Sequence, residues 1–134
     1  MTVMLKDPVI RVATAATAAI ILLLFAVAVT ACSPTAQALT FFPQDSHTQR
    51  KAACIIQRES GGNPNAISPT RDYGLFQINR AAHKANFQAR YHISFETGAL
   101  RPDLNARYAR YLYDYYKARG QDPFTPWHGG RYSC

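Results

Sequence analysis

One glutamate at the end of a predicted helix is well placed for acid–base chemistry. Ala52, Ile55, Ile56 and Glu59 are spaced at i, i+3, i+4 and i+7, so one helix face carries three apolar side chains and this carboxyl group. Apolar neighbours and the negative end of the helix dipole both disfavour the charged form, so we expect a raised pKa. A glutamic acid that stays protonated can donate a proton to a leaving oxygen. Periodicity alone equally allows a glutamate that borders the core and reaches solvent.

Two short motifs surround this glutamate, ESGGNPNA at residues 59–66 and DYGLFQIN at residues 72–79. Their order and spacing resemble the lysozyme superfamily. The lytic transglycosylase domain has a helix-ending Glu-Ser and a later Gly-Leu-x-Gln, whereas animal-type lysozymes have Glu-Ser and then Asp-Tyr-Gly-x-x-Gln-Ile-Asn. The resemblance covers roughly residues 45–79. It implies a small, mainly α, lysozyme-like fold (α+β, with at most a short hairpin), a sugar-binding cleft and Glu59 as general acid.

The same resemblance makes Asp72 a second catalytic candidate, because it aligns with the second carboxylate of animal-type lysozymes. Retaining hydrolysis needs two carboxyl groups ~5–5.5 Å apart. However, the segment between Glu59 and Asp72 is shorter than in those lysozymes, and transglycosylases of this type work with one glutamate. A turn aspartate that bonds its own backbone is the equally open alternative.

Several residues near the motifs are candidates for contact with sugar. Glycine lets a backbone approach a ligand closely, amides can bind N-acetyl groups, and aromatic rings can pack on sugar faces. Asn79 is equally well placed to cap the next helix, Ser60 to satisfy a helix end, and a sole Trp is more often a core residue. The candidate substrate-binding residues are Ser60, Tyr73, Gly74, Gln77, Asn79 and Trp127.

Cys54 and Cys134 are predicted to form a disulfide. A small exported domain has a thin hydrophobic core and often needs a covalent staple. Closing a loop of about 80 residues contributes ~4 kcal/mol in the loop-entropy model; two unpaired thiols are the alternative. Animal-type lysozymes also have a disulfide cysteine five residues before the catalytic glutamate, as Cys54 stands before Glu59. The histidines are scattered and form no metal-binding spacing, so we expect no metal and no cofactor.

The elements that must position these residues are predicted to be mostly helical. A first helix begins at a cap near Asp45 or Ser46, includes residues 49–58 and stops at the breaker cluster of residues 61–64. The preceding residues 33–43 are expected to form a linker.

Beyond the motifs, residues 73–79 are too short to assign, and a second helix is predicted over residues 81–88. A long helix over residues 104–118 is expected to begin at an Asp103 cap and end at Gly120. One face of this helix carries Leu104, Tyr108, Tyr111 and Tyr115. We interpret this face as part of the core; the alternative is that some of these tyrosines line a groove. The Ala-Tyr-Asn-like motif usual on the C-terminal side of transglycosylases is missing.

The first third of the chain resembles an export signal. Lys6 and Arg11 precede a nearly continuous apolar run over residues 12–31. Cys32 ends a lipoprotein-type box and would be lipidated, whereas residues 36–38 fit ordinary signal cleavage. A retained anchor, which needs ~20 apolar residues, is a third route, with Cys32 then buried in an uncleaved helix. Each route places the remaining chain outside the cytoplasm, as a secreted or envelope-associated protein.

The sequence therefore divides into residues 1–38, a signal peptide or membrane or lipid anchor with linker, and residues 39–134, one lysozyme-like transglycosylase domain. The formal net charge of +7 suits an anionic polymer, either cell wall or nucleic acid, or simply a solvated basic surface. Export favours the wall, so we expect a monomer that binds peptidoglycan glycan strands and no nucleic acid, with membrane contact through an uncleaved N-terminal segment.

The predicted function is cleavage of the β-1,4 bond between N-acetylmuramic acid and N-acetylglucosamine. A lytic transglycosylase that forms anhydro ends is preferred, because the short Glu59–Asp72 segment and the compact length fit that branch. The alternatives are a hydrolytic lysozyme that uses Asp72, a non-catalytic protein that binds the cell wall, and a membrane-anchored basic protein that binds nucleic acid.

Overall fold

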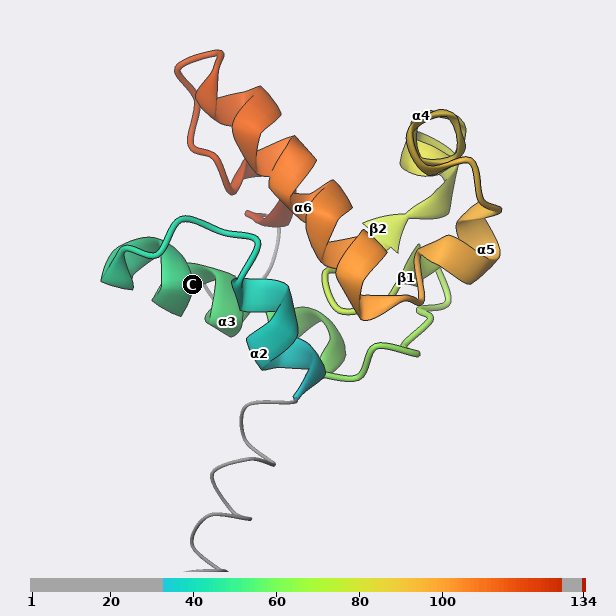
Figure 1. Cartoon of the computed structure of the whole chain (residues 1–134), viewed down its shortest axis with the longest axis horizontal. Helices are drawn as coiled ribbons and strands as arrows, with labels where there is room; N and C mark the ends of the chain where they lie inside the picture. Colours follow the sequence, from blue (N-terminus) through green and yellow to red (C-terminus); the bar gives the residue numbers. More distant parts are fainter. Residues whose placement is uncertain (1–32, 129–133) are drawn as a thin grey trace, which may run out of the picture. The chain divides into compact units, whose positions relative to one another are not determined.

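The computed structural model describes residues 33–128 and 134, so the apolar N-terminal run and Cys32 lie outside the described residues. Within the described part, no helix combines the length and the apolar character needed to cross a bilayer. The elements form one compact unit from Pro34 to Cys134 (Figure 1). In chain order they are α2 (Pro34–Leu39), α3 (Ser46–Ser60), β1 (Asp72–Tyr73), β2 (Ile78–Asn79), α4 (Arg80–Tyr91), α5 (Phe95–Gly98), α6 (Pro102–Lys117) and the 3-10 turn η1 (Thr125–Trp127). The mainly helical architecture with one short hairpin confirms the predicted fold class.

Helix α3 begins and ends where the sequence predicts. The Asp45 carboxylate accepts a hydrogen bond from the Thr48 backbone N–H, which is the N-cap contact that an aspartate makes. Gly61 ends the helix in the left-handed region at φ 62°, a conformation that glycine adopts without steric cost. The helix buries Ala52, Ile55 and Ile56 and places Glu59 in its last turn.

Helix α2 corrects the expectation of a linker over residues 33–43. Pro34–Leu39 is helical and packs against both α3 and α6. Ala38 has no exposed surface and Phe42 is 2% exposed, so both belong to the core. A six-residue helix has little stability of its own, and this packing is what holds it in place.

The hairpin is held by a buried amide from α6. Strands β1 and β2 are antiparallel, with Asp72 opposite Asn79. Asn105 accepts a hydrogen bond from the Phe76 backbone N–H, and its side-chain amide donates to the carbonyl oxygens of Tyr73 and Ala99. These bonds explain why an asparagine is fully buried here, since a buried amide without partners would be costly.

Helix α6 starts at Pro102, two residues earlier than an Asp103 cap would place it. Arg101 is the N-cap residue, Pro102 occupies the first turn, and Asp103 instead forms an ion pair with Arg101 at 3.0 Å. The predicted Asp103 cap is therefore wrong, because proline at the first helical position already sets the start. The short helix α5 was not predicted from the sequence.

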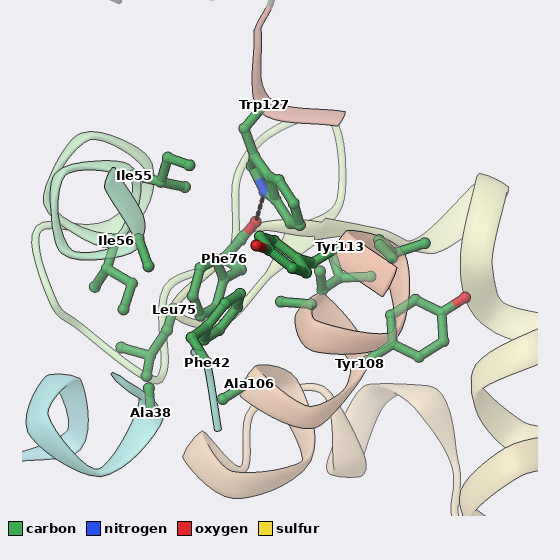
Figure 2. Close-up of a cluster of buried hydrophobic side chains, with 14 of the residues drawn as sticks. Ala38, Phe42, Ile55, Ile56, Leu75, Phe76, Ala106, Tyr108, Tyr113 and Trp127 are labelled. Atoms are coloured by element: carbon green, nitrogen blue, oxygen red, sulfur yellow. Dashed lines mark hydrogen bonds between the residues drawn. The ribbon is translucent and has the colours of Figure 1, made fainter. Parts of the chain in front are cut away.

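The core lies between α2, α3, the hairpin and α6. Figure 2 shows Phe42 beside Phe76, with Trp127 above them and the two isoleucines of α3 to one side. On α6, Tyr108 is fully buried, whereas Tyr115 is 39% exposed. The tyrosine face thus begins in the core, as predicted, and ends at the surface.

Candidate active site

A cleft of about 450 Å³ opens where α3, the hairpin, α4, α6 and η1 meet. It contains both carboxyl groups that the sequence singles out, together with polar side chains of the hairpin. Its lining consists of Glu59, Ser68, Asp72, Gln77, Ile78, Asn79, His83, Leu112, Pro126 and Trp127.

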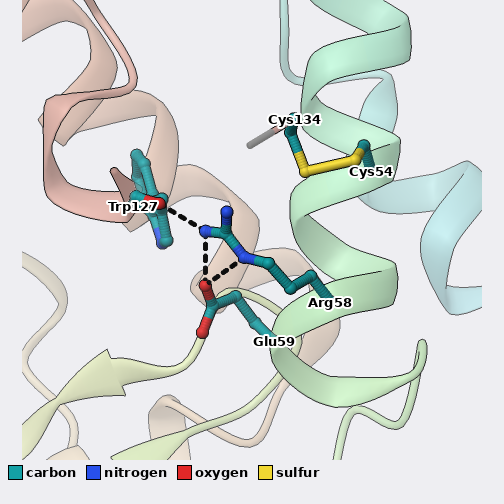
Figure 3. Close-up of a disulfide and its surroundings, with 5 residues drawn as sticks. All are labelled: Cys54, Arg58, Glu59, Trp127 and Cys134. Atoms are coloured by element: carbon teal, nitrogen blue, oxygen red, sulfur yellow. Dashed lines mark hydrogen bonds and ion pairs between the residues drawn. A yellow bond between two sulfur atoms is a disulfide. The ribbon is translucent and has the colours of Figure 1, made fainter. Parts of the chain in front are cut away.

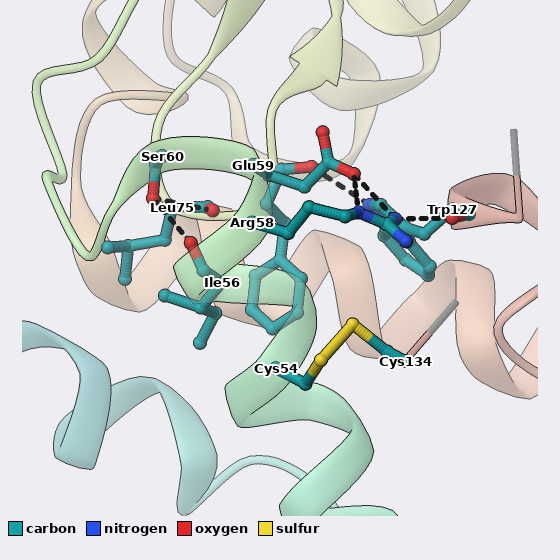
Figure 4. Close-up of polar contacts among 9 residues, drawn as sticks. Cys54, Ile56, Arg58, Glu59, Ser60, Leu75, Trp127 and Cys134 are labelled. Atoms are coloured by element: carbon teal, nitrogen blue, oxygen red, sulfur yellow. Dashed lines mark hydrogen bonds and ion pairs between the residues drawn. A yellow bond between two sulfur atoms is a disulfide. The ribbon is translucent and has the colours of Figure 1, made fainter. Parts of the chain in front are cut away.

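Glu59 reaches this cleft because α3 ends immediately after it. The Glu59 side chain is 27% exposed, so it is neither buried in the core nor free in solvent. The following residue fixes the end of the helix, since Ser60 Oγ donates at 3.1 Å to the Ile56 carbonyl and at 2.9 Å to the Leu75 carbonyl (Figure 4). Ser60 thereby joins the last turn of α3 to the hairpin and does not itself line the cleft.

The Arg58 guanidinium is a partner of Glu59 that the sequence does not predict. It donates from Nε at 3.0 Å and from Nη2 at 2.7 Å to Glu59 Oε1 (Figure 3). The same Nη2 donates to the backbone carbonyl of Trp127. Successive side chains in a helix point in different directions, so periodicity gives no reason to expect this pair. Arg58 thereby joins the Glu59 carboxylate to η1.

The predicted disulfide is confirmed, with Cys54 and Cys134 joined and their Cα atoms 5.7 Å apart. Cys54 lies one helical turn before Arg58 on α3, and neither cysteine lines the main cleft. Cys134, Arg58 and Trp127 instead line a neighbouring cavity of about 340 Å³. The bridge therefore fastens the C-terminus beside the side chain that contacts Glu59.

Asp72 lies in the same cleft, but both of its carboxylate oxygens accept hydrogen bonds from side chains of the hairpin and the turn before it. Oδ2 accepts hydrogen bonds from Ser68 Oγ at 2.6 Å and from Thr70 Oγ1. Oδ1 accepts from Asn79 Nδ2 at 2.7 Å. Partial burial opposes ionisation, but the hydrogen bonds from Ser68, Thr70 and Asn79 outweigh it and lower the pKa of Asp72 below 3.8. Asp72 is thus an ionised residue built into the turn.

The amides of Gln77 and Asn79 also have partners within the chain. Asn79 Oδ1 accepts from the Ala82 backbone N–H at 3.1 Å, so Asn79 caps α4, as one alternative predicted. Gln77 Nε2 donates to the carbonyls of Ala66 and Gly74. Both side chains line the cleft, and the amide oxygen of Gln77 has no donor among the described residues.

Gly74 and Tyr73 do not line the cleft. At Gly74, φ is 75°, and an added Cβ would lie 2.3 Å from the Ala99 carbonyl oxygen and 2.5 Å from Asn105 Nδ2. Glycine is therefore required here by close packing of the hairpin against α6 and the residue after α5. The Tyr73 ring packs edge-on against Phe95.

Two residues complete the far side of the cleft. Trp127 is 6% exposed and donates from Nε1 to the Phe76 carbonyl at 2.9 Å, so it is a core residue whose edge also lines the cleft. His83 was not singled out by the sequence. Burial lowers the pKa of His83 below 6.5, so its imidazole is neutral at pH 7, and Nδ1 lies 3.2 Å from the Tyr108 hydroxyl. Its position on α4, four residues after the Asn79 cap, is the signal that would have placed it at this cleft.

Comparison with known families gives a match that covers more than half of the chain. The family model of the transglycosylase SLT domain matches residues 43–127. The chain belongs to this family. The match includes the described cleft residues from Glu59 to Trp127 and confirms the resemblance noted in the two sequence motifs. Comparisons with curated proteins and with solved structures find no match.

Membership of the SLT family supports lytic transglycosylase activity on peptidoglycan in general. Proteins with this domain act on the cell wall, so an extracellular or envelope location follows for the enzyme. For the SLT domain of this chain, α3 and the hairpin are the two elements that bring the motif residues to one cleft.

Proposed function

We propose that this SLT domain cleaves the β-1,4 bond between N-acetylmuramic acid and N-acetylglucosamine and leaves a 1,6-anhydro end. Glu59 is the general acid and then the general base. The observation that carries this proposal is the difference between the two carboxyl groups of the cleft. Both carboxylate oxygens of Asp72 accept hydrogen bonds from side chains of the hairpin and the turn before it, whereas Oε2 of Glu59 has no hydrogen-bond donor among the described residues.

In the first step, protonated Glu59 donates its proton to the glycosidic oxygen. The bond from that oxygen to C1 of N-acetylmuramic acid breaks, and N-acetylglucosamine leaves with a new hydroxyl group. The carbonyl oxygen of the 2-acetamido group of the substrate stabilises the positive charge at C1, so a second protein carboxylate is not needed. The Arg58–Glu59 ion pair must separate for this step, because the reacting carboxyl group carries a proton and no charge.

In the second step, the Glu59 carboxylate takes the proton of the C6 hydroxyl of the same sugar. The C6 oxygen then attacks C1 and closes the anhydro ring. Glu59 is protonated again, so the cycle balances without consuming water. The product is lighter by one water than the corresponding hydrolysis product.

A hydrolytic lysozyme reaction is the second candidate, and one observation favours it. Asp72 lines the same cleft as Glu59, and its lowered pKa keeps it ionised, as a residue that stabilises a cationic intermediate must be. In that case water completes the reaction and the product has a reducing end.

Mass analysis of peptidoglycan digests decides between the two reactions. We expect muropeptides that are lighter by one water and resist reduction by borohydride. Exclusively reducing ends would move the protein to hydrolysis. Glu59→Gln should lower the rate by at least about 10²-fold, the range in which general acid–base catalysis contributes, with an unchanged melting temperature. A Glu59→Gln variant that clears cell walls at the normal rate would refute Glu59 as the general acid.

The N-terminal division is also a proposal. We place an export segment before the domain, with the boundary near Pro34 instead of after residue 38, because α2 packs into the domain. This boundary favours processing at Cys32 or retention of the segment, and disfavours cleavage after Ala38. The proposed partner is the glycan strand, bound by a monomeric enzyme without a cofactor, metal or nucleic acid.

A further inference from the structure

A second groove, of about 380 Å³, lies apart from the catalytic cleft. It is formed by the segment after α2, the end of α4 and the middle of α6. Three arginines and three aromatic residues line it with a single carboxylate: Phe41, Arg90, Tyr91, Arg107, Arg110, Tyr111 and Asp114. We call it the arginine groove.

Two of its arginines lie on aromatic rings and have no carboxylate partner among the described residues. The Arg90 guanidinium carbon is 3.9 Å from the centre of the Tyr111 ring, and that of Arg107 is 4.7 Å from the centre of the Phe41 ring. The one acid of the groove, Asp114, already accepts two hydrogen bonds from Arg110 Nε at 2.9 Å. The groove therefore keeps an excess of two positive charges.

Cation–π attraction holds a guanidinium over a ring without using its N–H donors in conventional hydrogen bonds. The N–H donors lie in the plane of the group, where they match the two oxygens of a carboxylate or phosphate. Neither Arg90 nor Arg107 donates a hydrogen bond within the described part of the chain, whereas Arg110 also donates to the Phe41 carbonyl at 2.9 Å. The rings thus hold in place two guanidinium groups whose N–H donors have no acceptor among the described residues. Because these groups are already ordered, less entropy is lost when an anion binds.

The positive charges of Arg90 and Arg107 both act on Tyr91 in the groove. The Tyr91 hydroxyl lies within the field of both guanidiniums: burial raises the pKa of Tyr91, and the charges of Arg90 and Arg107 partly offset that rise. Tyr91 is the last residue of α4, follows Arg90 in the chain and lines the same groove as Arg107 of α6. A ligand beside Tyr91 would meet both positive charges and the apolar rings of Phe41 and Tyr111.

We infer that the arginine groove binds an acidic peptide, namely the carboxylate-bearing stem peptide of the peptidoglycan substrate. The excess positive charge fits carboxylates, and the ring surfaces fit the small aliphatic parts of such a peptide. This inference rests on the proposed function, because that function supplies the substrate. The groove and the cleft lie on different faces of α6, which offers Arg107, Arg110 and Tyr111 to the groove and Leu112 to the cleft. The groove is thus a second contact with the wall.

Binding is measured separately from cleavage, in the Glu59→Gln background, by sedimentation with insoluble peptidoglycan. The test variant is Arg90→Gln with Arg107→Gln. The control is Arg50→Gln with Lys117→Gln, which removes the same charge from exposed residues outside the groove. Peptidoglycan with intact stem peptides is compared with glycan strands from which an amidase has removed them. Vesicles containing an anionic phospholipid test for a phosphate ligand.

We expect the groove variant to bind intact peptidoglycan about tenfold more weakly, the effect of losing two exposed ion pairs, and to bind peptide-free strands as the parent does. The control should differ little on either substrate. The inference would be overturned if the groove and control variants lost the same binding affinity, or if the groove variant lost the same affinity for both substrates. Stronger binding to the vesicles than to peptidoglycan through the groove would also overturn it. With Glu59 restored, the groove variant should cut peptide-free strands at the normal rate. Failure of the unmodified enzyme to cut would refute the proposed function and leave the binding result intact.

Discussion

Arg58 connects the candidate catalytic acid to the C-terminal tail. Its guanidinium donates two hydrogen bonds to Glu59 Oε1 and another to the Trp127 carbonyl, and the Cys54–Cys134 disulfide fastens the tail one helical turn away (Figure 3). The Glu59 carboxyl group is thus held in its position by a side chain that also contacts the C-terminal part of the chain. Its orientation should respond when this contact is changed.

Replacing Arg58 by Gln is expected to slow the reaction, because the two hydrogen bonds that fix the Glu59 carboxyl group are lost. The maximal rate should fall by about tenfold, because a carboxyl group without its fixed partner spends less time in the productive orientation.

The measurement is kcat and KM on purified peptidoglycan, with the melting temperature as a check on folding. Arg58→Lys should restore kcat incompletely, because an ammonium lacks the planar fork of a guanidinium. Arg50→Gln, which changes an exposed arginine on the same helix, is the matched control. An Arg58→Gln variant with an unchanged kcat would show that Arg58 does not position Glu59.

The sequence predicts the part of this site that depends on local signals. Asp45 and Gly61 mark the two ends of α3 through caps whose chemistry lies within a few residues. The position of Glu59 on the apolar face follows from those ends and from helical periodicity. The sequence shows the hairpin as a motif, but residues 73–79 alone do not indicate a strand, since Gly74 at φ 75° packs closely against Asn105 of α6.

The rest depends on residues far apart in the chain. Helix α2 is stable because it packs on α6. Its own sequence carries no strong helix signal, so it resembles a linker when the sequence is considered alone. The contact of Arg58 with the Trp127 carbonyl joins residues far apart in the chain, and so does the contact of His83 on α4 with the Tyr108 hydroxyl on α6. The hydrogen bonds of Asp72 arise from Ser68, Thr70 and Asn79, and only the folded turn brings their donors together. Periodicity and caps carry no information on such pairs.

Reduction of the disulfide is expected to lower both stability and activity. Breaking a bridge across 80 residues costs up to ~4 kcal/mol in the loop-entropy model. Because the tail also holds the Trp127 carbonyl against Arg58, the rate should fall even at temperatures where the domain stays folded. Intact mass with and without reductant should show two additional hydrogens, and a thermal melt gives the change in stability. A Cys54→Ser and Cys134→Ser variant with unchanged melting temperature and rate would contradict both effects.

The chain should tolerate removal of residues 1–32 but not of residues 1–38. A version that begins at Ser33 keeps α2, whereas one that begins at Leu39 loses it and exposes the core surface that Ala38 covers. A loss of about 1 kcal/mol lowers the melting temperature by roughly 4–8 °C in a domain of this size, and we expect at least that difference between the two versions. Equal melting temperatures would show that α2 contributes nothing and would make cleavage after Ala38 acceptable.

Asp72→Asn is expected to lower the stability of the domain while leaving much of its activity. The folded pKa of Asp72 lies below 3.8. The hydrogen-bonded carboxylate therefore adds stability above its unfolded pKa, and this stability is lost as the pH falls through the lower folded pKa. Asp72→Asn should be less stable than the unmodified domain at pH 7 by about 1 kcal/mol, the size of a typical hydrogen-bond loss, and the difference should shrink in strongly acidic solution.

Denaturant unfolding of both proteins across the acidic pH range measures this difference in the free energy of unfolding. Glu96, whose Arg80 partner lowers its pKa to about 2, also titrates there. Its contribution is the same in both proteins and cancels in the comparison. Activity at pH 7 should remain substantial in Asp72→Asn, because the proposed reaction draws its second stabilising group from the substrate. If the rate instead collapses while the fold survives, Asp72 is a second catalytic carboxylate, and the digests should then contain reducing ends. Glu59 keeps its role in either result, so this variant tests how the cation at C1 is stabilised and not which bond is cut.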